Sequence, residues 1–349
     1  MRTFDYGFLK TGQVPAGLVG TVAAIAEARE RHRTRAATAK HAEAFAALER
    51  LARVESVGTS NAIEGIATSG QRLRALVSRR AAPTNRAEAE IAGYRDALAL
   101  VHQGQSAPTL TEALVKRLHR AMFAYTGAPG GRYKARDNAI VEADRSGRRH
   151  VRFEPLPAAE TPQAMRQLVL AYRDAVGGQG VDPLLAAPCF VLDFLCVHPF
   201  ADGNGRVSRL LTLLALRHAG VDATRYVSFE GQINRTREDY YESLRESSRG
   251  WQAGAGDYFP FLLYSLRAAL ACYNELDGRF AALGEGRLTK KARVREAVLA
   301  HPVPIRKSEL ADILPDVSPT TIEAALGDLV RRGVVVKVGS GRATAYIAA

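Results

Sequence analysis

The sequence predicts a mainly α-helical protein with one β-hairpin near its middle and a small α+β domain at its C-terminus. Helical patterning of apolar residues runs from about Gly17 to Glu275, which sets the main class. Strand signals inside that stretch are confined to one hairpin pattern over residues 138–154. Residues 287–349 add three helical runs followed by two β-prone runs, which indicates a separate α+β unit.

Stretches rich in Gly and Pro mark the candidate linkers of the chain. They lie near residues 103–108, 177–183 and 284–286. We therefore expect three parts: an N-terminal helical region over residues 1–106, a central helical core over residues 107–286 and a C-terminal domain over residues 287–349.

The composition is that of an ordinary soluble globular protein. The 349 residues are 47% hydrophobic and 24% charged, with a formal net charge of +12. The richest apolar run, Leu184–Val197, is broken by a proline and an aspartate, so it falls short of the ~18 to 20 apolar residues of a membrane span. The first residues lack the apolar core of a signal peptide. We therefore expect a cytoplasmic protein with no membrane partner.

The cysteines agree with that expectation. Cys189, Cys196 and Cys272 offer neither a disulfide framework nor the C-x-x-C spacing of a metal site. Cys189 and Cys196 are seven residues apart on one apolar helix face, so we expect them to be buried packing residues.

One unbroken run, His198–Arg209, combines residue types that suit chemistry on a phosphate ester. His198 is the only side chain of the run that titrates near neutral pH, so it can accept a proton from an attacking hydroxyl. Asp202 is a hard oxygen ligand of the kind that Mg²⁺ accepts beside waters and substrate phosphates. The run therefore suits a nucleoside triphosphate together with magnesium.

A glycine turn follows within the same run. Gly203 and Gly205 flank Asn204, which lets backbone N–H groups come close to an anion. Residues 206–218 are predicted to form a helix with a broad apolar surface. The turn would then lie at a helix N-terminus, where free N–H groups and the macrodipole favour phosphate.

Two arginines complete the run. Arg206 and Arg209 are three residues apart, so we expect them to share a helix face and to clamp further phosphate oxygens. Taken singly, each fragment has an ordinary explanation as a helix cap, a turn or a solvated face. Their joint occurrence in one ordered run favours the functional interpretation.

The run resembles the signature of the Fic family, His-Pro-Phe-x-Asp/Glu-Gly-Asn-Gly-Arg-x-x-Arg, at every specified position. The resemblance covers roughly residues 1–285, and it implies an enzyme that moves AMP from ATP onto a hydroxyl side chain of a target protein and releases pyrophosphate. It implies that His198 is the general base and that Asp202 binds Mg²⁺. The implied nucleotide-binding residues are Gly203, Asn204 and Gly205 for the α- and β-phosphates, and Arg206 and Arg209 for the outer phosphates.

A second motif lies upstream, at Thr59–Gly65. It resembles the inhibitory motif of the same family, Ser/Thr-x-x-x-Glu-Gly/Asn, with Ser60, Glu64 and Gly65 at the specified places. The resemblance implies that Glu64 forms a salt bridge with Arg209 and crowds the γ-phosphate, so that ATP binds unproductively. A carboxylate beside that arginine would compete for the same charge-assisted hydrogen bonds. Taken alone, the motif would be a solvated glutamate at a helix end.

A third candidate is the hairpin. Residues 138–142 and 150–154 mix apolar and polar side chains around a polar turn, which predicts two short strands. This hairpin resembles the flap of the Fic family, which pairs with an extended target segment and lays its hydroxyl over the histidine. The alternative is an ordinary surface hairpin. The preceding Gly131–Lys134 also resembles the stretch that leads into the flap, and no chemistry is assigned to it.

Tyr240 and Tyr241 stand where members of the family often line the nucleotide pocket. Aromatic rings beside an adenine are reasonable, but two tyrosines on an amphipathic helix are more often part of a core. The sequence leaves both interpretations open.

The C-terminal domain is predicted from its own pattern. Residues 290–300, 307–314 and 318–333 are expected to be helices, the last opened by a Ser-Pro cap signal. Two β-prone runs, 334–338 and 344–347, follow on either side of a glycine-rich turn. Three helices followed by a hairpin resemble a winged helix-turn-helix.

The charge of this domain makes DNA a candidate partner. Residues 287–349 carry eleven Lys and Arg against six Asp and Glu, a net +5. In a DNA-binding winged helix, Thr320, Thr321 and Arg342 would face the duplex. Winged helices also serve as protein-interaction or dimerisation modules, so DNA binding is one of two alternatives.

Together these patterns predict a Fic-type protein adenylyltransferase that is restrained by Glu64. Its expected partners are ATP, Mg²⁺ and a target protein, or the chain itself, with a Ser, Thr or Tyr hydroxyl. Two other functions stay open: removal of AMP by the same site, and a DNA-binding regulator in which the Fic core is a sensor. A homodimer also stays open. The net charge of +12 suits ATP and acidic targets as well as nucleic acid.

Overall fold

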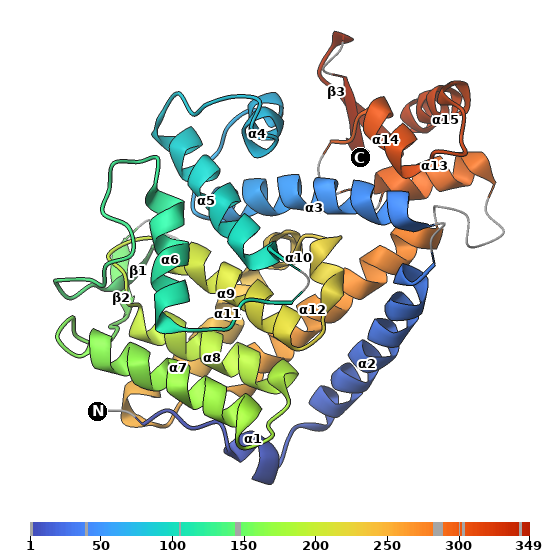
Figure 1. Cartoon of the computed structure of the whole chain (residues 1–349). Coiled ribbons are helices and arrows are strands. Elements are labelled where there is room, and N and C mark those ends of the chain that lie inside the picture. The colour runs from blue at the N-terminus through green and yellow to red at the C-terminus, as the bar shows by residue number, and fades with distance from the viewer. Residues whose placement is uncertain are drawn as a thin grey trace. The chain divides into compact units, whose positions relative to one another are not determined.

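The computed structural model describes residues 3–38, 41–104, 106–143, 148–281, 289–299, 301, 304–341 and 344–349 (Figure 1). These residues are mainly helical, and their strands form two separate antiparallel pairs, which confirms the predicted class. Contacts between Cα atoms divide the chain into two compact units. Unit 1 holds residues 1–23, 57–221 and 233–268, and unit 2 holds residues 24–56, 222–232 and 269–349. The division of the chain at residues 106 and 286 stays a prediction.

Unit 1 contains the helices that surround the predicted site. Those that lie within it are α1 (Phe8–Thr11), α4 (Gly70–Val77), α5 (Arg86–His102), α6 (Glu112–Phe123), α7 (Thr161–Gly177), α8 (Pro183–Val197), α9 (Asn204–His218) and α11 (Arg237–Ser248). The helices that continue from one unit into the other are α2 (Ala16–Ala36), α3 (Ala42–Ile63), α10 (Phe229–Arg235) and α12 (Phe259–Phe280).

Polar side chains start several of these helices. Ser69, Asn85 and Thr111 immediately precede α4, α5 and α6, and each accepts a hydrogen bond from a backbone N–H of the first turn. Such caps satisfy N–H groups that have no partner inside the helix. Apolar side chains of α5 and α6 then bury the facing sides of these two helices, which pack against each other.

Helix α8 runs through the interior of unit 1. Asp182 caps its start by accepting a hydrogen bond from the N–H of Leu184, and Pro183 occupies the first position, where a missing N–H costs nothing. Almost all its side chains are buried, including Cys189 and Cys196, as the sequence predicts. Helices α8 and α9 pack side by side (Figure 1), so the chain between them must turn within residues 198–203.

A buried carboxylate holds two other segments of unit 1 onto α8. Asp193 is fully buried and accepts hydrogen bonds from the hydroxyls of Tyr6 (2.8 Å) and Tyr258 (2.9 Å) and from the indole N–H of Trp251 (2.6 Å). A buried charge requires partners of this kind. Asp193 therefore ties the N-terminal segment and the segment after α11 to the helix that ends at His198.

The predicted hairpin is formed by β1 (Ile140–Ala143) and β2 (Arg149–Phe153). The strands are antiparallel, with Val141 opposite Val151, and both valines are exposed. The structure confirms the hairpin within one or two residues of the expected bounds. Its turn, residues 144–147, lies outside the described residues.

The C-terminal part of unit 2 has the predicted elements in the predicted order. These are α13 (Lys290–Leu299), α14 (Lys307–Ile313), α15 (Pro319–Arg331), β3 (Val335–Val338) and β4 (Ala345–Ala348). Ser318 caps α15, and an isolated bridge between Ile305 and Tyr346 adds backbone pairing beside β4. A shared apolar cluster holds the helices and the hairpin together; it includes Val294, Val298, Leu310, Ile322, Leu326 and Val335.

The surface of this part does not decide between the predicted partners. Thr320 is exposed and Thr321 is half-buried, while Arg342 lies outside the described residues. On the outward side of α15, Glu323 pairs with Lys307, and Asp328 pairs with the arginines at the end of the helix. DNA binding therefore stays a prediction.

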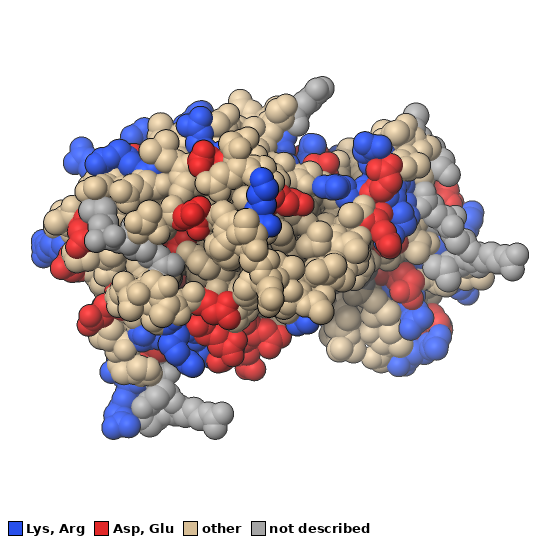
Figure 2. All heavy atoms as spheres, turned by 90° about the horizontal axis from the view of Figure 1, so that it is seen from below, with Lys and Arg blue, Asp and Glu red and all other residues tan. Residues whose placement is uncertain are grey.

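Charges of both signs are intermingled on the face shown in Figure 2, where one compact acidic group lies beside basic side chains. In the part of the chain that the structure describes, each helix is too short or too polar to cross a membrane.

Candidate active site

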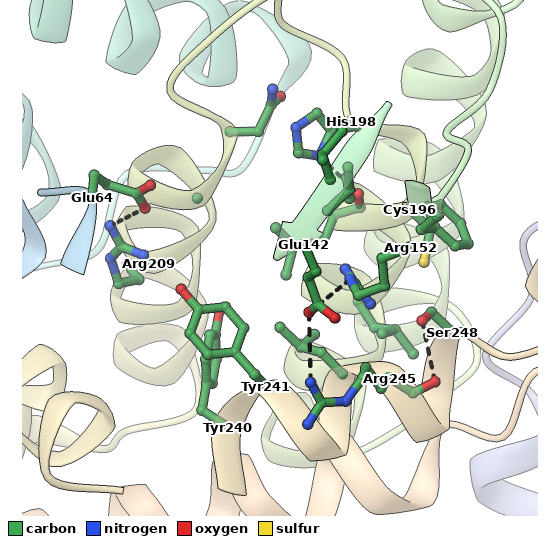
Figure 3. A pocket seen from close by; sticks show the side chains of 18 of the residues that line it. Glu64, Glu142, Arg152, Cys196, His198, Arg209, Tyr240, Tyr241, Arg245 and Ser248 are labelled. Carbon is green, nitrogen blue, oxygen red and sulfur yellow. Dashed lines mark hydrogen bonds and ion pairs between the residues drawn. The ribbon is translucent and has the colours of Figure 1, made fainter. Parts of the chain in front are cut away.

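A cavity of about 660 Å³ opens in unit 1 between the hairpin, the end of α8, the start of α9 and α11 (Figure 3). Sequence-predicted residues from distant parts of the chain line it: Glu64, His198, Asp202, Gly203, Asn204, Gly205, Arg209, Tyr240 and Tyr241. Ser60 and Gly65 support this group from outside the cavity wall, whereas Arg206 does not reach the cavity.

His198 ends helix α8 in a left-handed backbone conformation, with φ 50° and ψ 60°. Few residues other than glycine adopt this conformation, and such strain is typical of functional sites. The ring nitrogen Nδ1 lies 3.2 Å from the carbonyl oxygen of Leu195. A carbonyl only accepts, so Nδ1 carries the hydrogen of the neutral ring and Nε2 keeps its lone pair. His198 is therefore oriented as a proton acceptor.

The surroundings of His198 keep its ring neutral. Burial lowers the pKa of His198 to about 4, and the positive charges of Lys134 and Arg152 act in the same direction. The Leu195 carbonyl and Glu64 oppose this shift without reversing it. At neutral pH the ring is therefore an uncharged base.

The glycine turn lies at the N-terminus of α9, as predicted. Gly203 precedes the helix with φ 77°, and a Cβ at that position would come within 2.9 Å of Met122 and 3.0 Å of Phe123. The side chain of Asn204 is already engaged: its Oδ1 accepts from the N–H of Phe200 and its Nδ2 donates to the Phe200 carbonyl. Asn204 can therefore contribute to an anion site through its main chain, while its amide closes the loop.

Asp202 suits a magnesium ion that is shared with a substrate. Its Oδ1 accepts a hydrogen bond from the N–H of Gly203 at 2.6 Å, and its exposed carboxylate lines the cavity. Among the described residues, nowhere do three or more His, Cys, Asp or Glu side chains gather to hold a metal by themselves. Mg²⁺ commonly binds through one or two carboxylates together with waters and substrate phosphates, and a single Asp fits that mode.

Glu64 reaches Arg209 from the end of α3 (Figure 3). Its Oε1 accepts a hydrogen bond from Arg209 Nη2 at 2.8 Å. The hydroxyl of Ser60 accepts from Nε and the Ser60 carbonyl accepts from Nη2, each at 2.8 Å. Arg209 is 2% exposed and Glu64 is 36% exposed, so the guanidinium is fixed while the carboxylate faces the cavity. The three acceptors saturate one edge of Arg209.

Gly65 terminates α3 and so sets the position of Glu64. Its φ is 78°, and the N–H of Ile66 bonds back to the carbonyl of Asn61, the pattern of a glycine-closed helix end. A carboxylate at this end of a helix is unfavourable, because the last carbonyls carry negative partial charge. The pairing with Arg209 offsets that cost.

Arg206 departs from the prediction that it holds outer phosphates. Its Nη1 donates to Glu90 of α5 at 2.7 Å and to Asn61 at 3.4 Å, and its side chain is 2% exposed. The guanidinium also lies 5.6 Å from the ring centre of Phe123. A buried guanidinium needs a carboxylate partner, and Glu90 draws Arg206 away from the cavity.

Two residues that hold the loop 197–200 received no role from the sequence. Lys134 donates from Nζ to the carbonyl of Val197 at 3.2 Å and from its backbone N–H to the carbonyl of Pro199 at 2.8 Å. Asn138 accepts from Lys134 Nζ at 2.8 Å and donates to the carbonyl of Phe200 at 3.1 Å. The only sequence signal for them was the Gly131–Lys134 stretch and the start of the hairpin.

His119 supports the same loop from α6. Its Nδ1 accepts from the N–H of Gly131 at 2.7 Å, which leaves the hydrogen on Nε2 to donate to the carbonyl of Asp202 at 3.1 Å. Its ring stacks on Phe200 with centroids 3.8 Å apart. Burial lowers the pKa of His119 to about 4, so it too is neutral. No sequence pattern pointed to it.

A charged cluster occupies the other end of the cavity (Figure 3). Oε1 of Glu142, on β1, lies 3.3 Å from Arg152 Nε of β2 and 3.6 Å from Arg245 Nη1 of α11. These contacts join the hairpin to α11. No sequence pattern predicted the cluster, because charged residues on a short hairpin and an amphipathic helix are usually exposed to solvent.

Tyr240 and Tyr241 fit both of the interpretations left open. Tyr240 is 5% exposed and belongs to the core, and both rings line the cavity. Their ring centroids lie 5.2 Å apart in an edge-to-face arrangement.

One cavity thus holds a neutral histidine, a glycine turn at a helix N-terminus and a carboxylate paired with an arginine, and the sequence comparison agrees with that geometry. Residues 109–216 match the sequence model of the Fic/DOC family. This chain contains a Fic domain. The matched segment includes the complete run His198–Arg209.

Among curated relatives, a protein adenylyltransferase Fic of Nematostella vectensis is 28% identical over 214 residues, which is 60% of this chain and 45% of that protein. A protein of Aquifex aeolicus, described as a probable protein adenylyltransferase, is 30% identical over 141 residues, 40% of this chain and 38% of its own length. The matches thus span less than half the length of these curated relatives.

Solved structures share the fold of this chain. A Fic family protein of Desulfovibrio desulfuricans superposes with a TM-score of 0.61 at 21% identity, covering 97% of both chains. A Fic domain containing signaling protein of Bacteroides thetaiotaomicron gives 0.56 at 19% identity, over 74% of this chain and 96% of that one. Fic-1 of C. elegans gives 0.57 at 20% identity, over 76% of this chain and 73% of the other.

Proposed function

We propose that this Fic protein is a protein adenylyltransferase, which transfers AMP from ATP to a hydroxyl side chain of a target protein or of itself. The observation that carries the proposal is that His198, a neutral base with a free Nε2, lines the same cavity as the glycine turn at the start of α9. The base and the N–H groups of the glycine turn could therefore contact the same bound nucleotide and target hydroxyl. The names of the curated relatives support this reaction class.

In the proposed reaction, His198 Nε2 accepts the proton of the target hydroxyl as the oxygen attacks the α-phosphorus of ATP. The new bond joins that oxygen to phosphorus, and the bond to the β-phosphate oxygen breaks in line with it. N–H groups at the start of α9 stabilise the charge that develops on the α- and β-phosphates. Pyrophosphate leaves toward Arg209.

Magnesium would be held by Asp202 together with the phosphates, and when bound it supplies positive charge beside the leaving pyrophosphate. The loop that carries Asp202 is held independently of any metal. His119 donates a hydrogen bond to the backbone carbonyl of Asp202, and the side chain of Asn204 bonds to the backbone of Phe200 and closes the turn.

The hairpin is the proposed docking element for the target. Its exposed valines, Val141 and Val151, lie opposite each other on neighbouring strands. An extended segment can add to such a short sheet through main-chain hydrogen bonds, with alternate side chains facing the protein. The target hydroxyl would thereby be presented to His198, which lines the same cavity as β1 and β2.

Glu64 is the proposed restraint on this activity. Its carboxylate occupies Arg209, the only described cavity-lining arginine that lies on α9. While this pair persists, the terminal phosphate of ATP would lie beside the Glu64 carboxylate, and Arg209 would not be free to bind it. Repulsion between the two negative groups then disfavours the productive position of ATP.

The direct test is transfer of label. Wild type, Glu64→Gly and Glu64→Gly/His198→Ala proteins are incubated with Mg²⁺ and ATP labelled on the α-phosphate. Strong label on protein in the single variant, weak label in wild type and none in the double variant is the expected result. Absence of label from all three, while each is folded and binds ATP, would contradict the proposal.

Removal of AMP from a modified protein is a second candidate. The observation that favours it is that Glu64 faces the same cavity as His198 and is 36% exposed, so its carboxylate could orient a water toward a phosphodiester. Release of AMP from a labelled target by wild type, together with loss of that release in Glu64→Gly, would select this function.

A further inference from the structure

The described arginines that line the cavity differ in what they bind. Arg152 and Arg245 both pair with Glu142, and Arg209 pairs with Glu64. Arg237 has no carboxylate partner among the described residues. Within the described residues, its side chain makes one hydrogen bond, from Nη2 to the carbonyl oxygen of Ile63 at 3.1 Å.

Arg237 also stands at an unusual place for a cation. It is the first residue of α11, and positive charge at a helix N-terminus is unfavourable. Its guanidinium lies 5.7 Å from the ring centre of Tyr241, and its hydrogen-bond partner, Ile63, directly precedes Glu64. Arg237 is therefore anchored beside the inhibitory carboxylate, while its remaining N–H groups are open to the cavity.

The outer phosphates need more positive charge than Arg209 provides. A nucleoside triphosphate carries several negative charges, and Arg206, the first arginine of the signature, is buried against Glu90. We propose that Arg237 is the second phosphate-binding cation of this site and contacts the terminal phosphate of the nucleotide from the α11 side. This inference rests on the proposed function, since it takes a nucleoside triphosphate as the substrate.

The geometry separates Arg237 from the arginines around Glu142. Those two both pair with Glu142 at the hairpin end of the cavity. Arg237 instead lies beside the last residue of α3, Ile63, which directly precedes Glu64, the partner of Arg209. When Glu64 leaves Arg209, both guanidinium groups face the space that the carboxylate vacates. A phosphate there would receive charge-assisted hydrogen bonds from two sides.

Binding of nucleotides of different length tests this assignment without turnover. Affinities of ATP, ADP and AMP, each with Mg²⁺, are measured by calorimetry for Glu64→Gly and for Glu64→Gly/Arg237→Gln. Glu64→Gly/Arg237→Met is a second neutral variant that keeps the side-chain stem over Tyr241. Glu64→Gly/Arg267→Gln is the matched control, because Arg267 is an exposed arginine of unit 1 that does not line the cavity.

Loss of a charge-assisted hydrogen bond should weaken ATP binding by about tenfold or more, leave AMP within about twofold, and leave the Arg267 control unchanged. The inference would be overturned if each nucleotide bound the Arg237 variants with the same affinity as it binds their Glu64→Gly parent. Equal loss for ATP and AMP would overturn it as well, since Arg237 would then act through Tyr241. If Glu64→Gly does not bind ATP, the proposed function fails as well. If Glu64→Gly binds ATP and the Arg237 substitutions leave that affinity unchanged, only the present inference fails.

Discussion

The carboxylate of Glu64 lies in the space that a side chain on Gly205 would need. A Cβ built at Gly205 would come within 2.5 Å of Glu64 Oε1 and 3.4 Å of Arg209 Nη1. The absence of a side chain at Gly205 therefore leaves room for the Glu64 carboxylate at the start of α9, where the proposed function places a phosphate of ATP. In the proposed function, Glu64 would therefore compete with the phosphate for space as well as for the positive charge of Arg209.

Neutralising Glu64 without changing its size should release the site. We expect Glu64→Gln to raise label transfer from ATP by about tenfold or more, because a neutral amide neither repels a phosphate nor holds Arg209 as strongly. Glu64→Gly should do at least as much. If Glu64→Gln transfers label only at the wild-type level while Glu64→Gly is active, the inhibition comes from the size of the side chain and not from its charge.

Removal of the base should stop transfer without unfolding the protein. Asparagine tolerates the left-handed backbone of His198 better than alanine does, so His198→Asn separates loss of chemistry from backbone strain. In the Glu64→Gly background we expect transfer to fall by about 10²-fold or more, with ATP affinity and the melting temperature nearly unchanged. Full activity of His198→Asn would remove His198 from the mechanism.

The pH dependence should reflect the depressed pKa of His198. Only the neutral ring accepts a proton, and burial lowers its pKa to about 4. In Glu64→Gly, kcat/KM should therefore hold steady down to about pH 5 and fall below that value, whereas an unperturbed histidine would lose activity near pH 6.5. Arg152→Gln removes a positive charge that lowers the pKa, so its acidic limb should move to higher pH. An acidic limb near pH 6.5 in the parent would contradict this picture.

Asn138 should affect the rate more than nucleotide binding. Its amide accepts from Lys134 and donates to the carbonyl of Phe200, which holds the loop after His198. We expect Asn138→Ala, in the Glu64→Gly background, to lower kcat by about tenfold or more while KM for ATP changes little. Asn234→Ala is the matched control, because Asn234 is exposed and does not line the cavity. Equal effects of both substitutions would indicate a general loss of stability.

A packing prediction concerns the contact of α5 with α6. A Cβ at Gly93 would come within 2.0 Å of the carbonyl oxygen of Met122, a backbone atom that has little room to shift. Gly93→Ala should therefore destabilise the fold by about 1–3 kcal/mol in denaturant unfolding. Gly20→Ala is the control: nothing lies within 4 Å of its Cβ position in α2, so it should be neutral or slightly stabilising.

Much of the architecture could be predicted because its signals are local. Helical periodicity, the strands on either side of residues 144–147 and the Ser318 cap each depend on residues close together in sequence. The run His198–Arg209 is contiguous, so its base, turn and cation could be predicted together. Glu64 lies far upstream, and only its resemblance to a known motif connected it with Arg209.

The helical class, the hairpin and the residue types of the signature could thus be predicted from local sequence patterns. The tertiary structure decided which charges face the cavity. Glu90 of α5 takes Arg206 out of the site, while α11 brings Arg237 in. A charged side chain that is buried or lines a cavity needs hydrogen-bond or ion-pair partners, and its position depends on them. Those partners come from helices far apart along the chain, so local sequence patterns do not reveal them.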